Sequence, residues 1–306
     1  MRIFITGGSG WIGSVLVPML LRSGHKVVGL ARSDESEAKL QAAGAQTLRG
    51  DLGDLDILRE GAKASDGVIH LAFKHDVAFS AEGMIAAAAA DRRAIDAIGE
   101  ALAESDRPFV IASGTPSVPG RLATERDEPQ AAGPAAARVA NGAAVVAMAK
   151  RGIRSSVVRL PRSVHGQGEL HGFIPRLIAT ARESRVSGYV GDGSTRWPAV
   201  HVLDAANLFR IAVEAAQAGA VLHAVGDEGV STGEIAAVIG RHLDLPTASL
   251  AAEHFGFLGM VLARDQPASS ALTRELMGWQ PTHPGLIADL EYGHYFAEAQ
   301  PAINPR

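Results

Sequence analysis

The chain has 306 residues, and its 29 basic and 33 acidic residues give a net charge of −4, which argues against a general nucleic-acid binder. It contains no cysteine, which excludes disulfides, thiolate catalysis and cysteine-ligated metals. The first predicted strand begins at the N-terminus, so we expect no signal peptide, and no apolar run reaches the roughly 18 to 20 residues of a membrane span. We therefore expect a cytoplasmic protein in which a large nucleotide-binding domain is accompanied by a second, smaller domain.

A glycine-rich segment follows that first strand. The apolar run 3–5 has strand length, a helical apolar pattern begins at Ile12, and between them the chain places glycines at positions 7, 10 and 13. A dinucleotide-binding loop requires this context, because the glycines permit a tight turn, close approach of the backbone to a pyrophosphate and close packing of helix on strand. The helix N-terminus adds free N–H groups and a partial positive charge. The segment therefore predicts a dinucleotide cofactor.

The string 6–13, TGGSGWIG, resembles the TGxxGxxG fingerprint of the extended and atypical short-chain dehydrogenases/reductases, which are similar to NAD-dependent epimerases and dehydratases. The resemblance implies an α/β fold, a Rossmann-type doubly wound parallel sheet with a smaller C-terminal substrate-binding lid. It implies an NADP-binding core over 1–165 with a return at 198–225, and a substrate-binding region over 166–197 and 226–306. The loop residues implied to contact the cofactor are Thr6, Gly7, Gly10, Trp11, Ile12 and Gly13.

Cofactor choice is expected to depend on the end of the second strand, 25–30. An NAD-specific fold places an acidic side chain there, about 20 residues past the glycines, to bond the ribose 2′-hydroxyl. Here Arg32 and Ser33 occupy that place, and a guanidinium and a hydroxyl suit a 2′-phosphate. These two residues predict NADP. Asp34 keeps NAD open as an alternative, and a solvated surface arginine is the other interpretation of Arg32.

Further cofactor contacts are expected where the next strands end. Asp51 and Leu52 follow a third strand and resemble the family's acidic–hydrophobic pair that contacts adenine, although an aspartate there is also a common turn residue. The fourth strand, 67–73, is a near-continuous apolar run, which is typical of burial on both faces. Ligands bind at the carboxyl edge of such a sheet. The candidates at the end of this strand are Leu71, Ala72 and Lys74.

Catalytic groups are expected after the fifth strand, 107–112. The family places an active-site serine or threonine there, so the resemblance assigns Ser113 and its neighbour Thr115; a strand-end hydroxyl that bonds its own loop is the alternative. A Tyr-x-x-x-Lys pair, in which the lysine lowers the tyrosine pKa for proton donation, is expected on the next helix, about 134–150. That helix contains no tyrosine. Aligned on it, Arg138 occupies the tyrosine position and Gly142 the lysine position.

The sixth strand, 155–161, leads into a segment that resembles the family's R-P-x-x-V-Y-G sequence along the nicotinamide. The resemblance implies cofactor contacts from Pro161, Ser163 and Val164. His165 follows, and the candidate proton donors are Lys74, His75, Arg138 and His165. The histidines are attractive because the pKa of histidine lies near neutrality. A late segment, 274–281, is similar to the family's L-G-W-x-P signature, so the resemblance covers nearly all of the chain.

Three functions fit these residues. We favour an NADP-dependent oxidoreductase acting on a small carbonyl or alcohol; the alternatives are an epimerase or dehydratase that retains its cofactor, and a catalytically inactive NADP-binding sensor. The missing Tyr–Lys pair favours the sensor, and the ionisable groups near the expected nicotinamide disfavour it. The histidines lack H-E-x-x-H or comparable spacing, so we expect no metal. We expect a small-molecule substrate, no nucleic acid and no membrane, with the oligomeric state left open.

Overall fold

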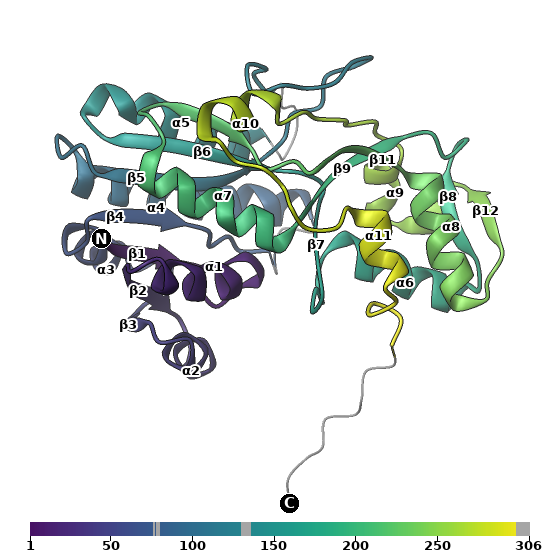
Figure 1. The fold of residues 1–306 in the computed structure, drawn as a ribbon, viewed down its shortest axis with the longest axis horizontal. Coiled ribbons are helices and arrows are strands. Elements are labelled where there is room, and N and C mark those ends of the chain that lie inside the picture. The colour runs from purple at the N-terminus through teal and green to yellow at the C-terminus, as the bar shows by residue number, and fades with distance from the viewer. Residues whose placement is uncertain (76, 78–79, 130–135, 298–306) are drawn as a thin grey trace, which may run out of the picture.

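A parallel seven-stranded sheet forms the centre of the computed structural model, which describes residues 1–75, 77, 80–129 and 136–297 (Figure 1). The strands lie in the order β10-β6-β5-β4-β1-β2-β3. Their bounds are β1 (Arg2–Thr6), β2 (Lys26–Ala31), β3 (Gln46–Arg49), β4 (Gly67–His70), β5 (Pro108–Gly114), β6 (Arg154–Leu160) and β10 (Ala220–His223). Because β1 pairs with both β2 and β4, the strand order reverses there, and a crevice for ligands is expected at the carboxyl end of β1.

Helices cover both faces of this sheet, each with its own apolar core. One face carries α1 (Trp11–Arg22), α2 (Asp34–Ala42) and α7 (Val202–Ala215), and the other carries α3 (Leu55–Lys63), α4 (Ala81–Leu102) and α5 (Ala136–Ala147). The side chains of Ile3, Phe4 and Ile5 alternate between the two cores and are fully buried. The predicted Rossmann-type doubly wound sheet is confirmed.

A smaller body stands beside the carboxyl end of the sheet (Figure 1). It has a three-stranded sheet in the order β11-β9-β7 and a two-stranded sheet that pairs β12 with β8. Its strands are β7 (Ser163–His165), β8 (Ser187–Val190), β9 (Arg196–His201), β11 (Asp227–Ser231) and β12 (Thr247–Leu250). Its helices include α6 (Phe173–Ser184), α8 (Thr232–Leu243), α9 (Phe257–Leu262) and α11 (Leu286–Glu291). We call this body the lid. We predict from the sequence that the region from about residue 226 onward is mainly helical. The structure adds the strands β11 and β12 to the helices of that region.

The chain passes more than once between the two bodies. After the lid strands, α10 (Ala271–Met277) returns to the Rossmann body, where Trp279 is fully buried and its Nε1 donates to the carbonyl of Asp204 at 3.1 Å. Among the helices that the structure describes, none is long and apolar enough to cross a membrane.

Two predicted elements end earlier than expected. The fourth strand stops at His70, and residues 71–73 leave the sheet to lie against the glycine loop. Within the described residues, the helix predicted over 134–150 is regular from Ala136 to Ala147 and continues as a 3-10 turn, η2 (Met148–Arg151); positions 134 and 135 lie outside the described residues.

Candidate active site

The glycine loop shows why each glycine is needed. Gly7 has a φ of +70°, and a Cβ there would lie 2.7 Å from the backbone nitrogen of Ala72. A Cβ at Gly13 would lie 2.2 Å from the carbonyl oxygen of Gly7. Gly10 is exposed, and the oxygen of Gly7, at 3.2 Å, is the neighbour that a Cβ there would meet. Gly7 and Gly13 therefore allow the loop to fold, whereas Gly10 leaves its outer side open.

The open side of Gly10 fits a pyrophosphate. Gly10 is the N-cap of α1, no side chain caps this helix, and its first turn carries no acidic residue. The first backbone N–H groups of α1 can therefore donate hydrogen bonds to a ligand, and the helix dipole favours a ligand with negative charge. The arrangement is the one that a dinucleotide requires.

The segment after β6 is tied to this loop. Trp11 Nε1 donates to the carbonyl of Val164 at 2.7 Å, and Ile12 packs against the core beneath it. Ser163 is buried, and its hydroxyl has no hydrogen-bond partner among the described residues. An unmatched buried hydroxyl costs about 1 to 3 kcal/mol, so a polar group of the cofactor bound there would stabilise it. Pro161 is buried beside it.

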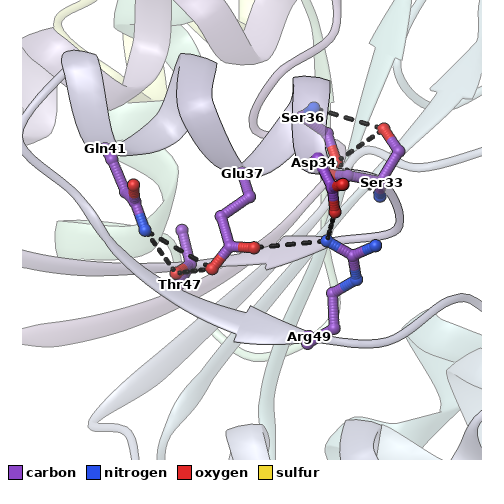
Figure 2. Close-up of polar contacts among 7 residues, drawn as sticks. All are labelled: Ser33, Asp34, Ser36, Glu37, Gln41, Thr47 and Arg49. Carbon is purple, nitrogen blue, oxygen red and sulfur yellow. Dashed lines mark hydrogen bonds and ion pairs between the residues drawn. The ribbon is translucent and has the colours of Figure 1, made fainter.

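Figure 2 shows the end of the site where a ribose 2′ substituent is expected. Arg49 reaches from β3 to the first turn of α2, where its Nη1 donates to Asp34 at 2.8 Å and to Glu37 at 3.2 Å. Ser33 caps α2, because its Oγ accepts from the backbone N–H of Ser36 at 3.2 Å. Arg32 is exposed and forms no ion pair within the described chain. Arg32 is thus available to a ligand, and the negative charge of Asp34 is balanced by Arg49.

Lys74 lies beside the predicted adenine contact. Its Nζ is 3.9 Å from Asp51 Oδ2, and Asp51 Oδ1 accepts from the backbone N–H of Gly53 at 2.6 Å. Leu52 is buried in the core, and the backbone N–H of Ala72 donates to Thr6 Oγ1 at 3.3 Å, which holds the end of β4 against the loop. These contacts favour the cofactor role over the catalytic role for Lys74.

A buried chain of hydrogen bonds joins the glycine loop to α5. Thr6 Oγ1 bonds His70 Nδ1 at 2.8 Å, His70 Nε2 bonds Asp91 Oδ1 at 3.0 Å, and Asn141 Nδ2 donates to Asp91 Oδ2 at 2.7 Å. Burial opposes ionisation of Asp91, yet the hydrogen bonds from His70 and Asn141 hold its pKa below the usual value. The sequence analysis did not identify His70 and Asp91 as site residues. The one feature of the sequence that could have pointed to them is a polar residue next to an apolar run.

Ser113 lies against α5, the helix that carries Arg138. A Cβ at Gly142 would lie 3.4 Å from Ser113 Oγ, so glycine at the family's lysine position lets α5 approach β5 closely. Arg138 stacks its guanidinium 3.8 Å from the ring centroid of Phe73. Burial lowers the pKa of Arg138, and the charge of Asp91 acts in the opposite direction. The Ser113 hydroxyl itself has no hydrogen-bond partner within the described chain.

Thr115 and His165 point to other parts of the molecule. The carbonyl and hydroxyl of Thr115 accept from Gln266 Nε2 at 2.6 and 3.3 Å, which ties β5 to the lid. His165 is fully buried, and its Nδ1 bonds Asp289 of α11 at 2.8 Å. Its Nε2 has no partner among the residues that the structure describes. The structure therefore does not bring these two predicted catalytic residues to Ser113 through any contact that it describes.

Glu169 and Tyr295 form a pair that the sequence analysis did not identify. The hydroxyl of Tyr295 donates to Glu169 Oε2 at 2.6 Å and accepts from the backbone N–H of Gly166 at 3.0 Å. Burial raises the pKa of Glu169 to about 7, against the effect of the hydrogen bond from Tyr295. The pair holds the segment after α11 against the loop that follows β7.

The strand order, the glycine loop and the segment after β6 are those of a known family, whose model matches residues 3–225. The chain belongs to the NAD-dependent epimerase/dehydratase family. It is 47% identical over 303 residues to an uncharacterised protein of Schizosaccharomyces pombe, which covers 97% of this chain and 100% of that protein. The family and its reductase relatives confirm the expectation of an enzyme that uses a nicotinamide dinucleotide.

Two of these relatives carry named activities. A 4-hydroxy-2-methyl-3-oxo-4-farnesyl-3,4-dihydroquinoline-1-oxide ketoreductase of Stigmatella aurantiaca is 30% identical, and a 2-alkyl-3-oxoalkanoate reductase of Stenotrophomonas maltophilia is 31% identical. Each alignment spans 234 residues, 72% of this chain and 67% of the relative.

Solved structures confirm the fold. The UDP-glucose 4-epimerase of Thermotoga maritima superposes with a TM-score of 0.76 at 19% identity, over 96% of this chain and 98% of that one. The UDP-glucose 4-epimerase of Thermus thermophilus, solved with NAD, gives 0.73 at 20% identity, over 98% and 100%.

Proposed function

We propose that this protein is an NADP-dependent oxidoreductase that acts on a small carbonyl or alcohol substrate. The observation that carries the proposal is the arginine at the end of β2: Arg32 is exposed and unpaired within the described chain, while Asp34, the residue that would favour NAD, is balanced by Arg49. A 2′-phosphate then meets a free guanidinium at the N-terminus of a capped helix. Two relatives are named as reductases of oxo compounds, which supports a reaction in which a carbonyl group is reduced.

The roles of the residues follow from their places. Bound NADPH supplies the hydride. Ser113, at the end of β5, donates its hydroxyl to the substrate oxygen, where negative charge develops as the hydride arrives. Arg138 lies on α5 at the position that the resemblance aligns with the family's tyrosine, and its positive charge stabilises the same oxygen. That oxygen then takes a proton from solvent water, which completes the alcohol. The buried chain from Thr6 to Asn141 fixes α5 relative to the glycine loop, so that cofactor and substrate groups keep their spacing.

The cofactor proposal is tested by titrating NADP and NAD into the protein by calorimetry. NADP is expected to bind more tightly, and Arg32→Ala is expected to reduce the difference about ten- to a hundredfold, because a charge-assisted contact contributes about 1.5 to 3 kcal/mol. Arg49→Gln is expected to reduce it too, since Asp34 and Glu37 then repel the 2′-phosphate. Arg22→Gln, an exposed change in the last turn of α1, is the matched control. Equal affinities for the two cofactors in the wild type would contradict the proposal.

The family name supports a second candidate, an epimerase or dehydratase that retains its cofactor. The two are separated by the fate of the cofactor when a panel of ketones and aldehydes is offered with NADPH. Net oxidation of NADPH supports the oxidoreductase, whereas product without net oxidation supports the second candidate. Tight NADP binding without any conversion supports the sensor.

A further inference from the structure

Arg162 lies where the Rossmann body meets the lid. It follows β6 directly, between Pro161 and Ser163, and its guanidinium donates to the side-chain oxygen of Gln266. Gln266 in turn donates to the carbonyl of Thr115 at the end of β5. The Arg162 guanidinium also lies 5.8 Å from the ring centroid of Phe173, the first residue of α6. Arg162 is therefore held between the strand that carries Ser113 and the first lid helix.

The charge of Arg162 has no carboxylate partner among the residues that the structure describes. Its Nε is buried and has no hydrogen-bond partner among the described residues. Burial lowers its pKa to about 10, and the charged neighbour that adds to this effect is Arg264, a second cation. Arg264 is exposed, and its side chain has no ion-pair partner within the described chain. The charge of Arg264 therefore acts on Arg162 as a like charge, and the group that accepts a hydrogen bond from Arg162 within the described chain is the neutral amide of Gln266.

Two other arginines show the contrast. Asp91 favours the charged form of the half-buried Arg138, and Asp127 and Glu125 favour that of the buried Arg159. A charge removed from water without a counter-ion is costly. Carboxylates lower this cost at Arg138 and Arg159, whereas the half-buried Arg162 forms no ion pair with a described residue.

A ligand that carries negative charge would remove this cost. Carboxylate and phosphate groups match the planar donors of a guanidinium and form short, charge-assisted hydrogen bonds with it. The Nε of Arg162 is a donor without a partner, and Arg264 adds a second positive charge at the exposed side.

We propose that Arg162 and Arg264 form an anion subsite that holds a carboxylate or phosphate group of the substrate, with Gln266 as the residue that orients Arg162. The use of this subsite in turnover rests on the proposed oxidoreductase function. The substrate is then an organic acid or a phosphate ester whose reacting carbonyl lies near Ser113, because Thr115, two residues along β5, is joined to Arg162 through Gln266. A neutral ketone of the same size binds more weakly.

Binding is tested without turnover. Malonate and inorganic phosphate are titrated separately by calorimetry into the NADP-saturated wild type, Arg162→Met, Arg162→Lys, Arg264→Gln and the control Arg22→Gln. We expect saturable binding of at least one anion, about ten- to a hundredfold weaker in Arg162→Met, and partly restored in Arg162→Lys because a lysine keeps the charge and loses the planar fork. Arg264→Gln is expected to weaken binding less, and the control not at all. The probe that binds more tightly distinguishes carboxylate from phosphate.

Unchanged anion affinity in Arg162→Met, or no binding of either probe to the wild type, would overturn the subsite. If Arg162→Met melts well below the wild type, Arg162→Gln replaces it, since glutamine keeps a polar group beside Gln266. If Arg162 only supports Gln266, its replacement lowers thermal stability and leaves the anion affinity unchanged. Thermal melting and calorimetry of the same samples distinguish this outcome.

Turnover separates the subsite from the proposed function. Two matched pairs are compared with NADPH: acetoacetate with acetoacetamide, and dihydroxyacetone phosphate with dihydroxyacetone. We expect the charged member of one pair to have the higher kcat/KM, and the ratio to fall about ten- to a hundredfold in Arg162→Met. Equal ratios in wild type and variant would refute the subsite while the reductase stands. Anion binding that depends on Arg162 without any NADPH oxidation would refute the reductase while the subsite stands.

Discussion

At the scale of single residues, small side chains decide how the site is built. Glycine at position 142 lets α5 come so close to Ser113 that a Cβ there would lie 3.4 Å from its Oγ. The exposed outer side of Gly10 leaves room for a pyrophosphate. Ser113 keeps a hydroxyl with no partner within the described chain, so its donor remains free for a substrate.

Replacing Ser113 with alanine is expected to lower turnover about 10² to 10³-fold, the usual effect of removing one donor from a preorganised oxyanion site. NADP affinity should stay nearly unchanged. The measurement is the steady-state rate of NADPH oxidation on an active substrate, together with a cofactor titration. Tyr292→Phe is the control because Tyr292 is exposed. Tyr295 is unsuitable as a control, since its hydroxyl bonds Glu169 and Gly166. A Ser113→Ala protein with full activity would remove Ser113 from the site.

At the scale of elements, the segment after α11 is held to the loop after β7 by a titrating pair. The buried carboxyl of Glu169 has a pKa raised to about 7 and accepts from Tyr295. A carboxylic acid with a raised pKa binds its proton more tightly in the folded protein than in the unfolded chain. The free energy of unfolding therefore falls as the pH rises from about 4.5 to about 7.

Glu169→Gln is expected to abolish this part of the pH dependence, because glutamine still accepts from Tyr295 and does not titrate. Between pH 4.5 and 7 the Glu169 contribution amounts to at most about 3 kcal/mol of unfolding free energy. Urea denaturation of wild type and variant at both ends of this range measures it. Glu60→Gln, a change at an exposed position of α3, should retain the wild-type slope. The same slope in Glu169→Gln would show that the carboxyl titrates normally.

At the scale of the whole molecule, the proposed cofactor loop is linked to the lid. Trp11, the first residue of α1, donates to the carbonyl of Val164 in β7, a strand of the lid sheet. A ligand that binds the folded protein alone raises its stability by mass action. NADP is therefore expected to stabilise the whole protein against heat.

NADP at a hundred times its dissociation constant should stabilise the wild type by about 2.7 kcal/mol, which appears as a higher Tm. Gly10→Val should fold, because Gly10 has an ordinary φ of −82° and open space, yet lose this shift, because its side chain would occupy the pyrophosphate site. Gly13→Val should melt lower without any ligand, since its Cβ would meet the oxygen of Gly7. An equal NADP shift in Gly10→Val would contradict the assignment of this loop.

The sequence by itself determined the fold class, the glycine loop and the family. These features depend on short-range patterns: apolar runs of strand length, helical spacing and glycines within a single turn. Arg32 and Ser33 predict NADP, and the family resemblance implies Ser113; both remain predictions, as does the cytoplasmic location. The lid strands β8 and β12 were not predicted, because such short strands alternate weakly and gain their stability from pairing with each other.

Only the tertiary structure decided which side chains meet. His70 and Asp91 are 21 residues apart, Asp91 and Asn141 are 50 apart, and Arg162 and Gln266 are 104 apart. No spacing rule covers such distances, because the partner of a buried polar group is set by the packing of whole helices and strands. Neighbours also act on the pKa of each half-buried cation: the charge of Asp91 acts to raise that of Arg138 and the charge of Arg264 acts to lower that of Arg162, although the two arginines look alike in the sequence. Charge balance in a protein interior depends on neighbours in space, and the folded structure supplies them.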